Sequence, residues 1–305
     1  MPERSLGMDA RILIISPMRN EAAHVARVAR ALAAQTHQPA EWIVVDDAST
    51  DDTAAILQEL QASIPFLSVH TREPDTEPVV DRLAVAAAPR AFNYGLARAG
   101  VRDWTHVMKL DGDIELPPNY FERMLEEYAR DPKLGMAAGN LIEPGRGGKM
   151  IPMPIARHHI HGALKLYTRE CFEAIGGVPT RLGWDTIDET YARLRGFTTR
   201  NWDDVVGIHH RPHASADGTL RGRARHGECA YIAHFSPLWV GLRSVKIMRD
   251  RPMVISGFAF FYGYVRSAVR RVEQVPDPEF RTFARSELRT RLRTEVFGVL
   301  RGRTT

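Results

Sequence analysis

Three carboxylates stand within five residues of the segment VMKLDGDIELPP, at Asp111, Asp113 and Glu115. An apolar run precedes them, so the acids follow the end of a predicted strand. Like charges repel and a carboxylate loses hydration on leaving water, so this cluster requires a compensating charge. Alternation along a strand would direct Asp111 and Asp113 to one side, with Gly112 leaving room for a ligand. A hard divalent cation with water and phosphate oxygens suits the pair; the alternative is an Asp-Gly turn that closes a hairpin.

A second acidic stretch, VVDDASTDDT, follows another apolar run at residues 41–45. Ligands of open parallel sheets bind beyond the carboxyl ends of the strands, which is where Asp46 and Asp47 are expected. Both acidic stretches are therefore expected at the same edge of a sheet. Taken alone, the second stretch is also consistent with a solvated acidic loop and a helix cap at Ser49 or Asp51.

Apolar runs and helical patterns alternate along the first third of the chain. Strand-like runs lie at 11–16, 41–45, 66–70 and 105–110, and helical patterns lie at 18–36, 54–64 and 91–100. This alternation predicts an α/β fold in which helices cover a parallel sheet.

Composition narrows the class of protein further. A chain of 305 residues, 44% of them hydrophobic, can form one large α/β domain or one domain with a C-terminal extension. Cys171 and Cys229 stand far apart without a CxxC pair, which disfavours a zinc site or a disulfide framework. The N-terminal stretch has no apolar core of signal-peptide length, so a reduced, cytoplasmic protein is expected. The basic last third indicates an anionic partner without identifying it.

Four stretches in order, IISPMRNE, VVDDASTDDT, RAFNYGLARAG and KLDGD, closely resemble the family 2 glycosyltransferases of GT-A fold, over residues 11–210. The resemblance implies an α/β GT-A fold, with a mostly parallel central sheet flanked by helices and a helical C-terminal extension. It implies a metal-dependent glycosyltransferase of the hexosyltransferase class that transfers a sugar with inversion. The implied donor is a nucleotide-diphosphate sugar, by family frequency a UDP-sugar. The implied acceptor is a hydroxyl of a saccharide or polyprenyl-linked saccharide in bacterial polysaccharide or glycolipid synthesis.

The same resemblance assigns contacts with the nucleotide and the metal. Residues implied in the nucleotide-sugar pocket are Pro17, Asn20, Glu21, Asp46, Asp47, Arg90 and Asn93. Asp113 would hold the Mn²⁺ or Mg²⁺ that bridges the donor diphosphate, and Asp111 would lie near the ribose or a metal-bound water. Of the adjacent His209 and His210, at most one can face a single site. We prefer His209 as a metal ligand, and a structural role is the alternative.

The segment GWDTIDE is expected as a loop before a short helix, TYARLRG. The family carries an acidic pair here, one member of which is the general base. Because the spacing departs from the commonest pattern, the base is Asp188 or Glu189, with Asp185 a weaker candidate, and we prefer Asp188. The alternative role is helix capping beside Thr190, which would also keep a carboxylate ionised.

Two other polar groups require an interpretation. Arg221, Arg223 and Arg225 are placed on a glycine-containing loop that would close over the diphosphate, with a solvated basic loop as the alternative. The histidines of an earlier run are interpreted as acceptor-pocket or surface residues rather than metal ligands: His158, His159 and His161.

Two domains are expected. Residues 1–235 would form the catalytic domain, with a nucleotide-sugar half at 10–115 and an acceptor half at 116–235, and residues 236–305 a basic, amphipathic helical extension. The apolar run from Met253 to Val265 is too short to cross a bilayer, which takes roughly 20 residues. Its basic flanks and aromatic residues favour a helix lying in the interface of an anionic membrane, peripheral on the inner face of the cell membrane. A core helix or a homodimer contact is the alternative, and no nucleic-acid partner is expected.

Two rival functions use similar chemistry. A sugar-phosphate nucleotidyltransferase would be expected to carry a glycine-rich, lysine-containing loop near its first strand, which SPMRNEA lacks. A non-catalytic nucleotide-sugar-binding scaffold would not require both the DGD and the GWDTIDE acids.

Overall fold

The computed structural model describes residues 9–73, 81–211, 218–250 and 252–300. The chain divides into two compact units, Met1–Pro212 and His213–Thr305. The division falls ahead of residue 235, the domain boundary expected from the sequence, and the function of residues 213–235 stays a prediction. Each unit is described below by itself.

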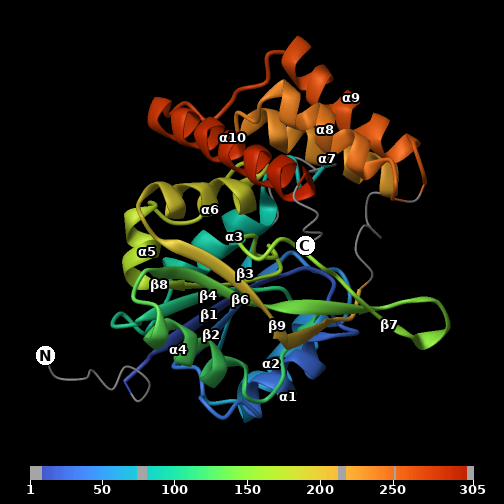
Figure 1. Cartoon of the computed structure of the whole chain (residues 1–305). Coiled ribbons are helices and arrows are strands. Elements are labelled where there is room, and N and C mark those ends of the chain that lie inside the picture. Colours follow the sequence, from blue (N-terminus) through green and yellow to red (C-terminus); the bar gives the residue numbers. More distant parts are fainter. Residues whose placement is uncertain (1–8, 74–80, 212–217, 251, 301–305) are drawn as a thin grey trace, which may run out of the picture. The chain divides into compact units, whose positions relative to one another are not determined.

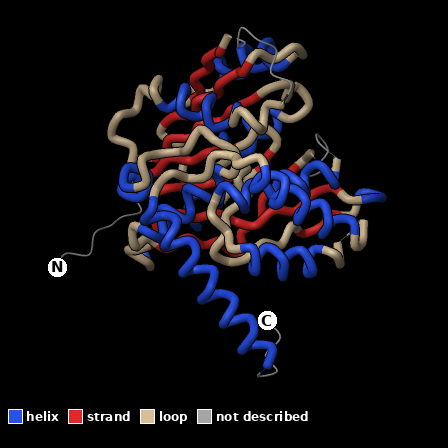
Figure 2. The backbone as a smooth tube through the Cα atoms, turned by 90° about the horizontal axis from the view of Figure 1, so that it is seen from above, coloured by secondary structure: helices blue, strands red, loops and turns tan. Residues whose placement is uncertain are grey.

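The first unit is an α/β unit whose strands run together through its middle, with its helices outside them (Figures 1 and 2). Its strands are β1 (Ile12–Met18), β2 (Glu41–Asp47), β3 (Leu67–Arg72), β4 (His106–Leu110), β5 (Ile114–Glu115), β6 (Leu134–Pro144), β7 (Met150–Pro152), β8 (Leu164–Thr168) and β9 (Thr198–His209). Its helices are α1 (Val25–Ala33), α2 (Thr53–Ser63), α3 (Ala87–Leu96), α4 (Tyr120–Arg130), α5 (Arg169–Ala174) and α6 (Trp184–Leu194), with a short 3₁₀ turn at Arg146–Gly148.

The sheet has the order β3-β2-β1-β4-β8-β6-β9-β5, with β7 paired to β6. Strands β3, β2, β1 and β4 are parallel, as the alternation of the sequence predicts. Beyond β4 the sheet is mixed, because β8 is antiparallel to both β4 and β6 while β6 and β9 are parallel. The expected α/β fold with a helix-covered sheet is confirmed.

Burial on both faces explains why the first strands are continuous apolar runs. Residues 12–15 of β1 and 42–45 of β2 have no exposed surface. Helix α1 packs through Val25, Val28, Ala29 and Leu32, which recur at helical spacing. Gly95 allows α3 to approach the sheet closely, since a Cβ there would lie 2.8 Å from side-chain atoms of β1 and β2.

Strand register brings the carboxyl ends of β1, β2 and β4 together. Met18 at the end of β1 pairs with Asp46 of β2, and Ile15 pairs with Lys109 of β4. The chain leaves β1 toward β2 on one side of the sheet, while β4 adjoins β1 on the other. This is a topological switch point, where α/β sheets form their binding crevices.

The second unit is helical: α7 (Thr219–Ile232), α8 (Pro237–Ile247), α9 (Ile255–Val269) and α10 (Pro278–Leu300). The prediction that Arg221, Arg223 and Arg225 lie on a loop is wrong, because the described residues from Thr219 onward belong to α7. Gly227 and Gly263 allow α7 and α9 to pack backbone against backbone, since a Cβ on either would overlap the facing helix. Within the described residues, no helix has the length and apolar character needed to span a membrane.

Candidate active site

Two loops at the carboxyl edge of the sheet are joined by side-chain hydrogen bonds. The backbone N–H of Asn20 donates to Ser49 Oγ at 3.0 Å, and the N–H of Thr50 donates to Asn20 Oδ1 at 2.8 Å. The N–H of Glu21 donates to Thr53 Oγ1 at 2.8 Å. Asn20 has φ 57°, a left-handed conformation that asparagine tolerates better than most residues. The loops after β1 and β2 therefore form one preorganised wall.

The adjacent aspartates of the second loop have different partners. Asp46 Oδ1 accepts a hydrogen bond from the N–H of Ser49 at 3.0 Å, which shapes the turn. Asp47 is buried and forms ion pairs with Arg72, at 2.6 Å, and with Arg82. Sequence reasoning missed both arginines. The register that pairs Asp47 with Arg72 across β2 and β3 is the signal that identifies Arg72, and it requires the sheet to be known.

The DGD acids lie in a tight turn between β4 and β5 rather than on a continuing strand. The N–H of Asp111 donates to the carbonyl of Ala163 at 2.8 Å, and the N–H of Ile114 donates to the carbonyl of Asp111 at 3.3 Å. An Asp-Gly turn is therefore present, but it does not close a hairpin, because β5 pairs with β9 and β4 pairs with β1 and β8. Gly112 is required here, because a Cβ would lie 2.9 Å from Cγ of both Glu21 and Met18.

Carboxylates from two strand ends crowd around this turn. Burial first, and then the negative charges of Asp113 and Asp111, raise the pKa of Glu21 to about 7, against the opposing charge of Arg211. Arg211 Nη2 lies 2.6 Å from Glu21 Oε2, and Arg211 Nε lies 3.7 Å from Asp113 Oδ2. Lys109 is paired with Asp111. The cluster is therefore strongly acidic but already faced by two cations.

His209 faces Asp113, and its neighbour faces elsewhere. His209 Nε2 lies 3.4 Å from Asp113 Oδ2. Burial acts to raise the pKa of Asp113, but the pKa is lowered by the hydrogen bond and charge of His209 together with the charges of Arg211 and His24. The pKa of His209 is raised, because Asp113 outweighs the opposite effect of burial. His210 Nε2 lies 2.7 Å from Glu115 Oε2 and Nδ1 lies 2.9 Å from Arg27 Nη1, so both its ring nitrogens are engaged.

The donor set fits an open site for a hard divalent cation. Across the described residues, no three His, Cys, Asp or Glu side chains are arranged as a complete metal cage. Mg²⁺ uses one or two carboxylates and takes its other ligands from water and phosphate, and Mn²⁺ prefers similar oxygen ligands. Asp111 and Asp113 on a short turn supply two carboxylates of this kind, and His209 lies beside Asp113.

The acids of GWDTIDE lie within helix α6, not in a loop before it. Asp188 has no exposed surface. Its Oδ1 accepts from Lys165 Nζ at 2.8 Å and from the N–H of Glu189 at 2.6 Å, while its Oδ2 accepts from Tyr167 OH at 2.6 Å. Burial first, and then repulsion from Glu189, raise the pKa of Asp188 to about 6, although Lys165 opposes them.

Glu189 completes a buried charged network. Lys165 Nζ lies 3.2 Å from Glu189 Oε1, and the N–H of Ile160 donates to the same oxygen at 2.9 Å. His159 Nδ1 lies 2.9 Å from Glu189 Oε2. Burial acts to raise the pKa of Glu189, but the charges of His159 and Lys165 lower it well below its usual range. Sequence reasoning missed Lys165, a lysine with no exposed surface inside an apolar strand.

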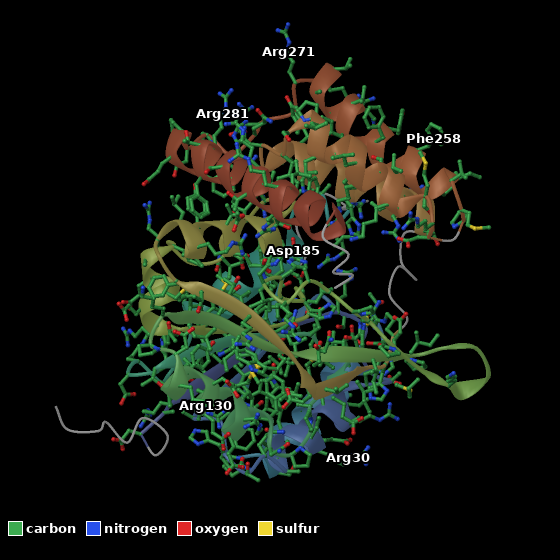
Figure 3. All side chains as sticks on the ribbon, viewed as in Figure 1. Arg30, Arg130, Asp185, Phe258, Arg271 and Arg281 are labelled. Carbon is green, nitrogen blue, oxygen red and sulfur yellow. The ribbon has the colours of Figure 1, made fainter. Side chains whose placement is uncertain are left out.

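Asp185 is the partly exposed carboxylate of this segment, in the first turn of α6. A Cβ on Gly162 would lie 3.4 Å from Asp185 Oδ2, so the two residues are neighbours. The carbonyl of Gly162 accepts from Lys109 Nζ at 2.7 Å, and Lys109 is the partner of Asp111. A short path of contacts therefore joins Asp185 to the DGD turn. Figure 3 labels Asp185.

The remaining predicted residues are dispersed. Arg90 is exposed on α3, whereas Asn93 Nδ2 donates to the carbonyl of Val178 at 3.0 Å. Pro17 lies at the end of β1, beside the carboxylate cluster. Arg221 and Arg223 belong to the second unit, where Arg223 pairs with Asp250 at 2.8 Å. Their role at the diphosphate stays a prediction.

A family model and several curated proteins match parts of this chain. The model of the family described as glycosyl transferase family 2 matches residues 13–173. Poly-beta-1,6-N-acetyl-D-glucosamine synthase of Staphylococcus aureus (strain COL) is 27% identical over 104 residues, which are 34% of this chain and 22% of the synthase. The chain thus spans about a fifth of the length of that curated relative.

Solved structures share the fold over most of the chain. The mannosyltransferase PcManGT from Pyrobaculum calidifontis, solved with GDP-Man and Mn²⁺, has a TM-score of 0.54 at 17% identity, covering 96% of this chain and 88% of that one. S. aureus TarS 1-349 with UDP has a TM-score of 0.51 at 14% identity, covering 85% and 72%. At these identities the similarity shows the fold alone, and it confirms the expected GT-A-like architecture.

Proposed function

Because the chain belongs to glycosyl transferase family 2 and is a glycosyltransferase, we propose that it transfers a sugar from a nucleotide-diphosphate donor to a hydroxyl of a saccharide or lipid-linked saccharide. The observation that carries this proposal is the convergence of Glu21, Asp111 and Asp113 at the carboxyl ends of β1 and β4, beside His209 and Arg211. The solved neighbours carry GDP-Man, UDP or UDP-GlcNAc, which supports a nucleotide-sugar donor without selecting one.

We assign the donor to the wall formed by the loops after β1 and β2. The turn shaped by Asp46 and the ion-paired Asp47 would meet the base and ribose, as the resemblance implies. Arg211 and Lys109 place positive charge beside the carboxylates, where a diphosphate would otherwise be repelled. Asp113, with Asp111 and His209, would hold Mn²⁺ or Mg²⁺. When bound, such a cation supplies Lewis-acid stabilisation of the leaving diphosphate.

The general base must contact the acceptor hydroxyl while that hydroxyl attacks the sugar carbon. Asp188, the base preferred from the sequence, is fully buried with both oxygens occupied by protein donors. Asp185 is partly exposed and joined through Gly162 and Lys109 to the DGD turn. We therefore propose Asp185 as the base and assign Asp188 and Glu189 to positioning α6. Inversion by single displacement requires one such base and remains part of the proposal.

A donor panel tests the reaction directly. UDP-glucose, UDP-GlcNAc and GDP-mannose are incubated with the full chain, with and without Mn²⁺, and sugar hydrolysis or transfer is measured. We expect turnover of at least one donor that requires metal and is lost in Asp113→Asn. Wild-type turnover by Asp113→Asn, or turnover that continues after the metal ion is removed with a chelator, would overturn the assignment of the carboxylate cluster.

A further inference from the structure

Helix α9 presents two apolar faces, only one of which is covered. Its buried face includes Phe260 and Tyr264, which pack in the core of the second unit. Its opposite face carries five exposed apolar residues: Phe258, Phe261, Tyr262, Val265 and Val269. With 3.6 residues per turn, these five fall within an arc of about 100°. An arc of polar residues is the usual outward face of a helix in a globular protein.

Helix α8 repeats this arrangement. Val240, Ser244 and Ile247 are buried, while Leu238, Leu242 and Val245 recur at helical spacing on the opposite side and are exposed. The link between the two helices adds further exposed apolar side chains at Met253 and Val254, and Ile255, the first residue of α9, is exposed as well. We call the exposed apolar residues of α8, the link and α9 the outward apolar face. Helices α8 and α9 pack on each other at Gly257 and Ser244, and this many exposed apolar side chains on neighbouring helices mark an interaction surface.

Positive charge accompanies this face. Residues 237–272 contain seven arginines and lysines and a single acid, Asp250, which pairs with Arg223. The described cations are all exposed: Arg243, Lys246, Arg249, Arg266, Arg270 and Arg271. Arg266 of α9 and Arg270, which directly follows α9, lie to one side of the apolar arc of that helix. On α8, Arg243 and Lys246 likewise lie to one side of the exposed apolar residues. Phe258 and Arg271 both project outward from the helices of this unit (Figure 3).

We propose that the outward apolar face is a membrane-docking surface that lies in the interface of an anionic bilayer. Exposed phenylalanine and tyrosine suit the boundary between headgroups and acyl chains, and the cations beside them suit anionic headgroups. Helices α8 and α9 are too short to cross the bilayer, in agreement with the absence of a spanning helix among the described residues.

A second copy of the chain fits this surface less well. A symmetric dimer places the same patch on both sides of the interface, so the cations around one patch would face those around the other. Like charges brought together in this way oppose association, whereas anionic lipid neutralises them. Charge complementarity therefore favours lipid. Membrane binding is also independent of the donor, the acceptor and the transfer reaction, so it can be measured separately.

Co-sedimentation of the full chain with vesicles tests the apolar contact. Binding is expected to vesicles of equal parts phosphatidylcholine and phosphatidylglycerol, and to be weak on phosphatidylcholine alone. Phe258→Ser combined with Phe261→Ser should weaken binding at least about tenfold, since two apolar side chains no longer enter the interface. Both residues are exposed, so circular dichroism should be unchanged; Phe260 is 2% exposed and is unsuitable. The matched control is Leu220→Ser, an exposed apolar residue on α7.

A charge series tests the electrostatic contact. Arg266→Gln combined with Arg270→Gln should weaken binding roughly 25-fold, because one cation near an anionic surface contributes a factor of about five. Arg30→Gln combined with Arg102→Gln removes the same charge from exposed positions of the first unit and should change binding less than about twofold. Three results would overturn the proposal: no binding to anionic vesicles, equal binding to neutral vesicles, or a solution dimer that Phe258→Ser/Phe261→Ser dissociates.

Discussion

Removal of the buried cation Lys165 should destabilise the first unit severely. Lys165 has no exposed surface, and its Nζ lies 2.8 Å from Asp188 Oδ1 and 3.2 Å from Glu189 Oε1. Lys165→Met keeps much of the volume but leaves these carboxylates without their shared cation. Breaking a buried ion pair by removing one partner costs about 3–5 kcal/mol. Whole domains have free energies of unfolding of about 5–15 kcal/mol, so the variant should be marginally folded.

The destabilisation should depend on pH with a definite sign. The pKa of Asp188 is raised from its ordinary value of 3.8 to about 6 in the folded protein, so the folded state binds the proton more tightly than the unfolded state. Asp188 therefore favours folding below about pH 4 and loses that contribution as the pH rises through 6. Without Lys165 the pKa of Asp188 rises further. The free-energy loss in Lys165→Met should consequently be larger at pH 8 than at pH 5.5.

Urea unfolding followed by tryptophan fluorescence measures this effect. Four of the five tryptophans lie in the first unit, and the Trp184 ring centre is 5.2 Å from Lys165 Nζ, so the signal reports the relevant region. Lys133→Met, at an exposed lysine, is the matched control and should change stability by less than about 0.5 kcal/mol. Lys165→Met combined with Asp188→Leu should recover part of the loss. A loss below about 1 kcal/mol at pH 8, or one equal at both pH values, would refute the reasoning.

The remaining predictions concern chemistry and packing. Asp113→Asn should abolish metal-dependent turnover while circular dichroism shows an intact fold, and wild-type kinetics in this variant would contradict the metal assignment. Asp111→Asn should weaken donor binding, which calorimetry measures. Asp185→Asn should lower kcat by roughly 10²–10⁴-fold with donor affinity unchanged, whereas Asp188→Asn should chiefly lower the free energy of unfolding. If Asp188→Asn lowers kcat and Asp185→Asn chiefly lowers stability, the general base is Asp188. Gly95→Ala should cost about 1–3 kcal/mol in unfolding experiments, because its Cβ would lie 2.8 Å from Ile15 and Val45, whereas Gly222→Ala meets no atom within 4 Å and should be neutral or stabilising.

Local patterns predicted the parallel half of the sheet well. The apolar runs at 11–16 and 41–45 became β1 and β2 because residues buried on both faces of a strand leave a continuous apolar signal. The antiparallel insertion of β8 between β4 and β6 has no such signal, since it depends on long-range pairing. The segment SADGTLRGRARHG, residues 215–227, was expected as a glycine-containing loop that carries arginines. The glycine at 227 instead permits close helix packing with α9, which only the tertiary structure reveals.

Residue roles were harder to predict than residue positions. The acids at the ends of β2 and β4 were located correctly by their places in the sequence, but their partners Arg72, Arg82 and Arg211 come from distant segments. Exposure within the apolar run at 253–265 was also unpredictable, because Phe260 is buried and Phe258 is exposed only as a result of how α9 packs.

We propose that Asp188 and Glu189 serve the reaction by holding α6 in place and do not contact the substrate. Lys165 on β8 binds Asp188 and Glu189 and also donates to the carbonyl of Asp185 at 2.5 Å. A helix held at its first turn by a buried cation cannot rotate without exposing uncompensated charge, so Lys165 fixes the backbone position of Asp185. On this proposal, the acidic pattern that family resemblance attaches to catalysis divides into one partly exposed carboxylate, Asp185, and two buried carboxylates that hold its helix in place. Asp188→Asn and Asp185→Asn should differ accordingly, the first in the free energy of unfolding and the second in kcat.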